Sequence, residues 1–326
     1  MMNRPVKILA IDGGGIRGII PATVLAHIES ITGRPIAELF DLIAGTSTGG
    51  ILALGLTIPK TAGAPLRTAQ NFVEMYEREG RKIFSRSIWR RIVACNNLTE
   101  EKYCTAGIDA VLADYFGESR LADAATDVLV ASYEIEHSFP FFFKSSNARE
   151  RLDYDFPARL VARATSAAPT YFEPMKLPAG TSTDYYTLID GGVFANNPAA
   201  CALVEARTTH PDADDFLVVS LGTGTMNLSL SYSETRTWGV ARWAAPLLNI
   251  VFDGVSSTVD YQLRQLLPDA AGESQRYYRF QTTLDGHNHA LDNTSTTNIT
   301  ALKGLATDLI EKESGNIEKL CKKLAE

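Results

Sequence analysis

The sequence predicts an α/β fold of three layers, in which helices cover both faces of a mainly parallel central sheet. Short apolar runs alternate along the chain with helical patterns, and glycine clusters directly follow several of these runs. Strands that alternate with helices form parallel sheets that are buried on both faces. A chain of 326 residues is within reach of one large domain, so we expect a single domain over residues 1–326.

The elements follow from the hydrophobic period and from the turn residues. Strands are expected over 6–11, 42–44, 128–135, 139–144, 185–189 and 216–221. Helices are expected over 18–31, 51–56 and 158–168, after Asn197-Pro198, and in most of the chain beyond Trp238. Ligands of open α/β sheets bind at the edge where parallel strands end, which is where the glycine clusters fall.

Composition excludes some classes of function. The net charge of -7 disfavours a protein that binds nucleic acid polymers, because such proteins carry a basic patch or stripe. The four cysteines are scattered without a CxxC pair, and no His, Cys or carboxylate cluster has the spacing of metal ligands. We therefore expect neither a metal nor another cofactor.

The N-terminus lacks the apolar core of a signal peptide, which predicts a cytoplasmic protein. The longest uncharged apolar run of the C-terminal half covers residues 243–252, about half of the ~20 residues that a spanning helix needs. Attachment to membranes would then be peripheral. In the stretch 83–95, Trp89 with Arg90 and Arg91 could form an interfacial helix or an ordinary packed one.

The first candidate site is Gly45-Thr46-Ser47-Thr48-Gly49, which stands between an apolar strand and an apolar helix. A tight turn of this kind needs small neighbours and pushes the serine hydroxyl outward as a nucleophile. The alternative is a small-residue turn that only lets the strand and helix pack closely.

The second candidate site is the run of Gly13, Gly14 and Gly15, followed by Arg17. It formally matches a dinucleotide fingerprint, but no acidic residue ends the next strand to hold a ribose. Successive glycines expose backbone N–H groups that can stabilise an oxyanion. Arg17 would support a phosphate or the loop, or form a plain salt bridge.

The third candidate is Asp190 with Gly191 and Gly192 at the end of a strand, where a carboxylate could act as the base for Ser47. None of the five histidines follows a strand in this way. A Ser-His-Asp triad with His287 or His289 remains an alternative.

Together the three motifs resemble the patatin-like phospholipases, whose members combine DGGGIRG, GTSTGG and DGGV in this order. The motifs stand here at residues 12–18, 45–50 and 190–193, and further similar stretches occur at 165–171 and 221–225. The resemblance implies hydrolysis of lipid acyl esters by a Ser47–Asp190 dyad without a metal. It also implies an oxyanion hole from Gly13, Gly14 and Gly15.

Because the chain lacks a signal peptide and continues Asn196-Asn197-Pro198, it looks more like bacterial members of the family than like secreted plant patatins. Some bacterial relatives are membrane-degrading effectors activated by a cyclic nucleotide, which is a second hypothesis. Other hypotheses are a non-catalytic binding or storage protein, an NAD-dependent enzyme and an acyltransferase. The sequence does not indicate an oligomeric state.

Overall fold

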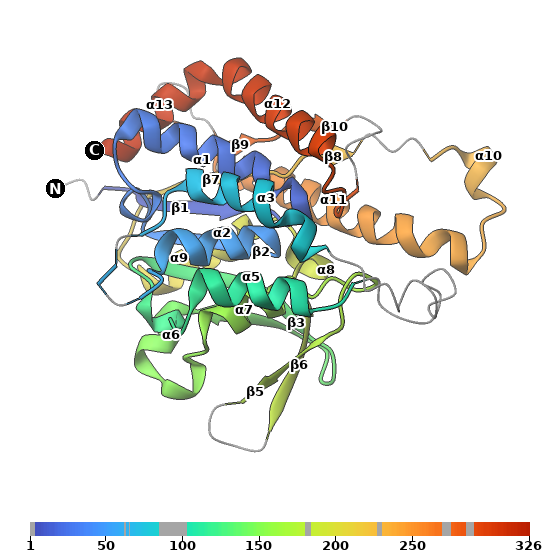
Figure 1. The fold of residues 1–326 in the computed structure, drawn as a ribbon. Coiled ribbons are helices and arrows are strands. Elements are labelled where there is room, and N and C mark those ends of the chain that lie inside the picture. Colours follow the sequence, from blue (N-terminus) through green and yellow to red (C-terminus); the bar gives the residue numbers. More distant parts are fainter. Residues whose placement is uncertain are drawn as a thin grey trace.

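A computed structural model of the chain describes residues 4–61, 63–64, 66–84, 103–179, 184–226, 230–268, 275–284 and 290–326. It confirms the three-layer α/β architecture, with helices on both sides of a central sheet (Figure 1). The strand order is β5-β6-β3-β2-β1-β7-β9, and β4 pairs with β3. The bounds are β1 Val6–Ile11, β2 Leu42–Thr46, β3 Asp127–Glu134, β4 Phe139–Lys144, β5 Met175–Pro178, β6 Tyr185–Asp190, β7 Phe216–Leu221 and β9 Tyr277–Phe280. A separate parallel pair joins β8 Thr225–Met226 to β10 Thr283–Leu284.

The centre of the sheet is parallel and one edge of it is antiparallel. Strands β3, β2, β1, β7 and β9 run parallel to their neighbours in that order. Strands β4 and β6 pair antiparallel with β3, and β5 pairs antiparallel with β6. The short strands β5 and β9 were not predicted, since each has only four residues and no clear alternation.

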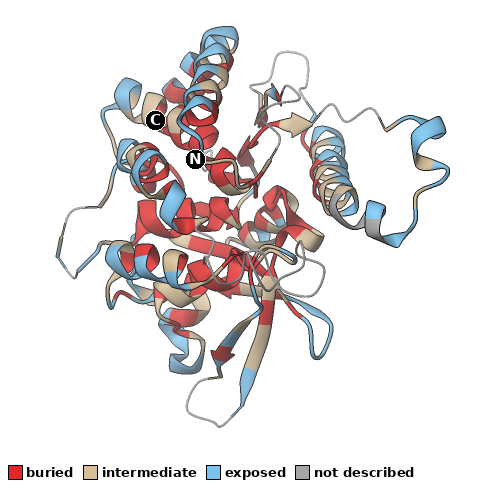
Figure 2. Cartoon of the chain, turned by 45° about the vertical axis from the view of Figure 1, so that its right-hand side comes forward, coloured by how far each residue is buried: buried red, intermediate tan, exposed pale blue. Residues whose placement is uncertain are grey.

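Successive residues of β1 serve different halves of the core, as the pleat of a strand requires. Leu9 and Ile11 belong to the larger apolar cluster, whereas Ile8 and Ala10 belong to the smaller one. All of them are fully buried. The continuous apolar run is therefore explained by helices on both faces of the sheet (Figure 2).

The larger cluster lies under most of the helices and the smaller cluster lies under two of them. The bounds are α1 Ile19–Thr32, α2 Thr48–Thr57, α3 Ala69–Ile83, α5 Ala106–Phe116, α6 Ser145–Glu150, α7 Ala158–Thr165, α12 Thr296–Lys312 and α13 Ser314–Ala325 around the larger cluster. Helices α9 Ala199–Thr209 and α11 Val240–Leu266 cover the smaller cluster. Two short α-helices are also present, α8 Gly192–Ala195 and α10 Tyr232–Thr235.

The antiparallel strand β6 determines where the third motif lies. Asp190 stands opposite Ser132 in β3, one residue beyond Ala131, which pairs with Thr46 at the end of β2. Strand β6 thus approaches from the opposite direction and ends where β2 ends. Asp190 and Ser47 share one edge of the sheet, as predicted, although their strands are not parallel.

Two predicted features lie outside the described residues. Helix α3 ends at Ile83, and residues 85–102, which include Trp89, Arg90 and Arg91, are not described. His287 and His289 are not described either. Within the described ranges, no helix is long and apolar enough to cross a membrane.

Candidate active site

Ser47 occupies a strained turn between β2 and α2. Its backbone angles are φ 56° and ψ -124°, a region that L-residues rarely adopt. The Ser47 N–H donates to Oγ1 of Thr165 at 2.8 Å, and that hydroxyl donates to the carbonyl oxygen of Ala131 at 2.6 Å. The turn is thus held by a side chain from α7. This geometry matches the strand–turn–helix context of a nucleophile elbow.

The glycines on either side of Ser47 are required by close backbone contacts. A Cβ atom on Gly45 would lie 2.1 Å from the carbonyl oxygen of Gly49, and one on Gly49 would lie 2.1 Å from that of Ile11. The first oxygen belongs to helix α2 and the second to strand β1, so neither can move without displacing one of these elements. The supporting role predicted for Gly45 and Gly49 therefore has a steric cause.

Asp190 is a buried carboxylate with few partners. It is 1% exposed, and Oδ1 accepts a hydrogen bond from the Gly192 N–H at 2.8 Å. Oδ2 makes no hydrogen bond of normal geometry in the described part of the chain, although the Ser47 hydroxyl lies near enough to lower the pKa of the carboxyl. Burial dominates and raises the pKa of Asp190 to about 7. A carboxyl poised near neutrality can both take and return a proton.

The turn after Asp190 is as crowded as the elbow. A Cβ atom on Gly191 would lie 2.4 Å from the carbonyl oxygen of Ala131, and one on Gly192 would lie 2.9 Å from the ring of Phe252. Only glycine fits at Gly191 without moving β3, which accounts for the DGG pattern.

Two carbonyl oxygens of the glycine loop are anchored by hydrogen bonds. The carbonyl oxygen of Gly13 accepts from Oγ1 of Thr223 at 2.6 Å, and that of Gly14 accepts from Nε of Arg17 at 3.2 Å. Because the C=O and N–H of a trans peptide point in opposite directions, the N–H groups of Gly14 and Gly15 point away from these anchors. Both glycines line the cavity that contains Ser47.

Gly13 differs from its two neighbours. Its N–H donates to the carbonyl oxygen of Asn196 at 3.0 Å, whereas no acceptor for the N–H of Gly14 or Gly15 is found among the described residues. The prediction that all three glycines donate to an oxyanion therefore conflicts with the engaged N–H of Gly13.

Arg17 is buried beneath this loop, with 3% of its surface exposed. Burial lowers its pKa to about 10, which leaves the guanidinium charged at neutral pH. Among the described residues, no carboxylate lies within salt-bridge distance of the guanidinium. The more distant negative charge of Asp253 offsets part of the lowering of the pKa of Arg17. Of the alternatives raised for Arg17, the structure supports the one in which it holds the loop.

The glycine loop is also held by a residue that the sequence analysis did not single out. Arg279 on β9 forms a bidentate salt bridge with Asp12, with Nη2 2.6 Å and Nη1 2.9 Å from the carboxylate oxygens. Both side chains are buried; burial by itself would lower the pKa of Arg279, but the charge and hydrogen bonds of Asp12 outweigh it and the pKa is raised. Asp12 begins the glycine loop, so this pair fixes the loop to the end of the sheet.

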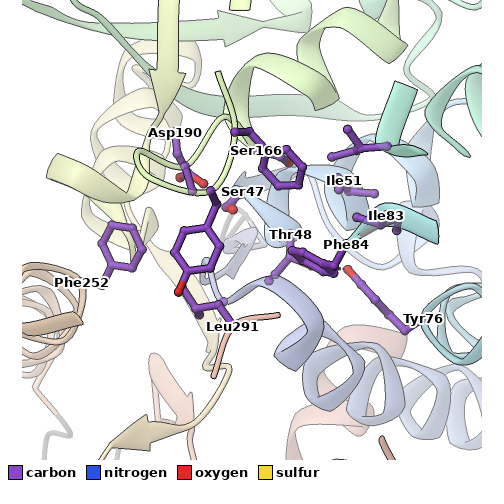
Figure 3. A pocket seen from close by; sticks show the side chains of 16 residues that line it. Ser47, Thr48, Ile51, Tyr76, Ile83, Phe84, Ser166, Asp190, Phe252 and Leu291 are labelled. Carbon is purple, nitrogen blue, oxygen red and sulfur yellow. Dashed lines mark hydrogen bonds between the residues drawn. The ribbon is translucent and has the colours of Figure 1, made fainter. Parts of the chain in front are cut away.

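Ser47 opens into a narrow, mainly apolar cavity with a free volume of about 40 Å³. Figure 3 shows Asp190 and Phe252 on one side of Ser47, with Ile51, Ile83 and Phe84 on the other. The further lining residues are Gly14, Gly15, Thr48, Tyr76, Ile108, Ser166, Ala168, Tyr171, Phe172 and Leu291. A serine among mainly apolar walls suits an ester of an apolar acid.

Three of the five histidines can be placed, and none of these lines the cavity. His27 lies on α1, His137 pairs with Glu134 at 3.2 Å, and His210 follows α9. No group of three His, Cys, Asp or Glu side chains among the described residues could hold a metal ion.

The elbow, the carboxylate and the glycine loop define the class to which the protein belongs. The patatin-like phospholipase family model matches residues 9–203, and the chain belongs to this family. It is 33% identical to patatin-like protein 4 of Arabidopsis thaliana, over 94% of this chain and 83% of that protein. It is 32% identical to patatin-T5 of Solanum tuberosum, over 95% and 85% of the two chains.

Other comparisons limit what membership implies. The chain is equally similar, at 32% identity over 95% of its length, to a Solanum tuberosum protein named probable inactive patatin-3-Kuras 1, of which it covers 88%. VipD from Legionella pneumophila aligns with a TM-score of 0.35 and 10% identity over 95% of this chain and 67% of that one, too weak a likeness to carry an argument. These sequence relatives are plant proteins, so a bacterial type stays a prediction.

Proposed function

We propose that the protein is a serine lipid acyl hydrolase in which Ser47 is the nucleophile and Asp190 is its base. The observation that carries the proposal is the strained Ser47 turn beside a buried carboxyl whose pKa is raised to about 7. A serine hydroxyl is a weak nucleophile until a neighbouring base takes its proton. Asp190 is the only carboxylate among the described residues that line the cavity.

In the first half of the reaction, Asp190 takes the proton of the Ser47 hydroxyl while Oγ attacks the carbonyl carbon of the ester. The electron pair of the C=O bond moves to its oxygen, and the N–H groups of Gly14 and Gly15 stabilise the resulting oxyanion. The start of α2 behind Ser47 also favours negative charge. When the tetrahedral intermediate collapses, the alcohol leaves with the proton from Asp190, and Ser47 retains the acyl group.

In the second half, Asp190 takes a proton from water, whose oxygen attacks the acyl carbonyl carbon. Collapse of the second intermediate breaks the bond to Ser47 Oγ, which recovers the proton and releases the carboxylic acid. No step needs a metal, since the oxyanion is stabilised by backbone N–H groups.

The substrate is a lipid ester whose acyl chain enters between Phe84 and Phe252. The apolar lining and the family support phospholipids or related acyl lipids. The cavity as it stands is narrow, so these side chains must move for a long acyl chain to enter. Acyl transfer would use the same dyad with an alcohol in place of water. No feature of the described residues favours activation by a cyclic nucleotide.

Hydrolysis of a dissolved p-nitrophenyl butyrate is the simplest test. We expect release of nitrophenol that is unchanged within about twofold by an excess of EDTA, because the chemistry uses only protein groups. The parallel sample without EDTA is the control. Activity that disappears with EDTA and returns with Ca²⁺ or Zn²⁺ would contradict the dyad mechanism.

A further inference from the structure

An arm formed by residues 230–251 projects from the body of the protein. It consists of α10 and the first half of α11, and both views show it standing clear of the other layers (Figures 1 and 2). None of its side chains that the structure describes is buried. From Phe252 onward the same helix packs on the body, where Phe252, Ser256 and Leu263 are buried.

The arm is apolar despite its exposure. Val240 is 90% exposed and Leu247 is 51% exposed, and they share one face of α11 with Trp243 and Ile250 because these positions are three or four residues apart. Trp238 packs edge-on against Trp243 with ring centroids 5.3 Å apart. Two of the three tryptophans of the chain therefore lie on this arm. Such an exposed apolar face needs an occupant.

The charges of the arm indicate the chemistry of that occupant. The charged residues of the arm are Glu234, Arg236 and Arg242, and Glu234 is engaged at the start of α10 in the capping box with Ser231. The arm thus has a net positive charge, although the whole chain has a net charge of -7. A second copy of the arm would bring these like charges together, whereas an anionic lipid surface would attract them. Tryptophan beside arginine is also a typical composition for the interface of a bilayer.

The arm is continuous with the catalytic cavity. Phe252 directly follows it on α11 and forms part of the cavity wall near Ser47 (Figure 3). A surface bound by the arm would therefore lie beside the mouth of the cavity. We propose that residues 230–251 bind the surface of an anionic lipid bilayer and so bring acyl chains to Ser47. The delivery of acyl chains to Ser47 rests on the proposed function, but the binding of the arm to a bilayer can be measured without catalysis.

The test compares two sets of variants in sedimentation with vesicles of phosphatidylglycerol and phosphatidylcholine. Val240→Ser with Trp243→Ala and Leu247→Ser removes apolar surface, and Arg236→Glu with Arg242→Glu reverses the charge. Tyr261→Ser with Leu266→Ser is the apolar control, since these residues are 67% and 62% exposed at the other end of the same helix. Arg34→Glu with Arg151→Glu is the charge control, in loops away from the arm.

We expect each arm variant to bind vesicles and hydrolyse vesicle phospholipid at least about tenfold less well than the wild type, because both apolar contact and charge contribute to interfacial binding. Hydrolysis of dissolved p-nitrophenyl butyrate and thermal stability should stay unchanged, and both controls should behave as wild type.

Vesicle binding that the arm variants leave intact would overturn the proposal. So would a joint loss of stability and soluble-ester hydrolysis, which would make the arm a structural element. A wild-type dimer in light scattering that the arm variants dissociate would identify a second copy as the occupant. A wild type that binds vesicles through the arm but hydrolyses no ester would refute the proposed function and leave this inference standing.

Discussion

Ser47→Ala is expected to lower kcat/KM for p-nitrophenyl butyrate by a factor of about 10⁴ or more, because Ser47 carries the hydroxyl beside Asp190 that forms the acyl intermediate. The variant should remain folded. Alanine removes one hydroxyl from a half-buried side chain, and the Ser47 N–H can still donate to Thr165. The measurement is initial rate against substrate concentration, with the unfolding temperature of both proteins as the control for folding.

Thr48→Ser is a useful matched variant, since it keeps a hydroxyl next to the elbow and leaves Ser47 in place. It should retain most of the activity. Near-normal turnover by Ser47→Ala would mean that the ester is hydrolysed by a different group.

Asp190→Asn is expected to reduce the same rate nearly as far, because the amide keeps the shape of the carboxylate but cannot accept the proton of Ser47. The double variant with Ser47→Ala should be little worse than either single one, since residues that act as a unit are not additive. Replacing His287 and His289 together should leave most of the activity. An essential histidine pair with a dispensable Asp190 would establish the Ser-His-Asp alternative.

The same carboxyl predicts the pH dependence. The pKa of Asp190 is raised to about 7, so the base form and kcat/KM should increase as the pH rises through about 7 and then level off. A flat profile between pH 5 and 9 would contradict Asp190 as the base.

The stability of the wild type should change with pH in the direction opposite to its activity. Because the pKa of Asp190 is about 7 in the folded protein and 3.8 in the unfolded chain, wild-type stability falls as the pH rises from about 4 to 7. In that range the carboxyl ionises in the unfolded chain but stays protonated in the folded protein. Asp190→Asn lacks this cost, so it should exceed the wild type in free energy of unfolding by on the order of 2–4 kcal/mol at pH 8. The difference should disappear near pH 4. An inactive but more stable variant would separate a catalytic role from a structural one.

The parts of the site that the sequence predicts are those with a local signal. Ser47 and Asp190 each follow an apolar strand and are flanked by glycines that close backbone contacts require. The central strands could be predicted for the same reason, since each is a short segment of mainly apolar residues that stands next to turn residues.

The remaining features depend on contacts between segments distant in the sequence. Nothing near Arg279 indicates that it pairs with Asp12, 267 positions away. The engagement of the Gly13 N–H by Asn196 is likewise invisible in a run of three glycines. The antiparallel direction of β6 depends on its pairing with β3, and its short apolar run is compatible with either direction.

The central claim is that Ser47 is activated as a nucleophile by its surroundings. A fluorophosphonate reacts with such a serine and leaves a stable phosphonyl group on Oγ, which peptide mass spectrometry can locate. We expect stoichiometric labelling of Ser47 in the native protein, and little labelling of Asp190→Asn or of the unfolded wild type. Label on another residue, or none on a folded protein, would contradict the account.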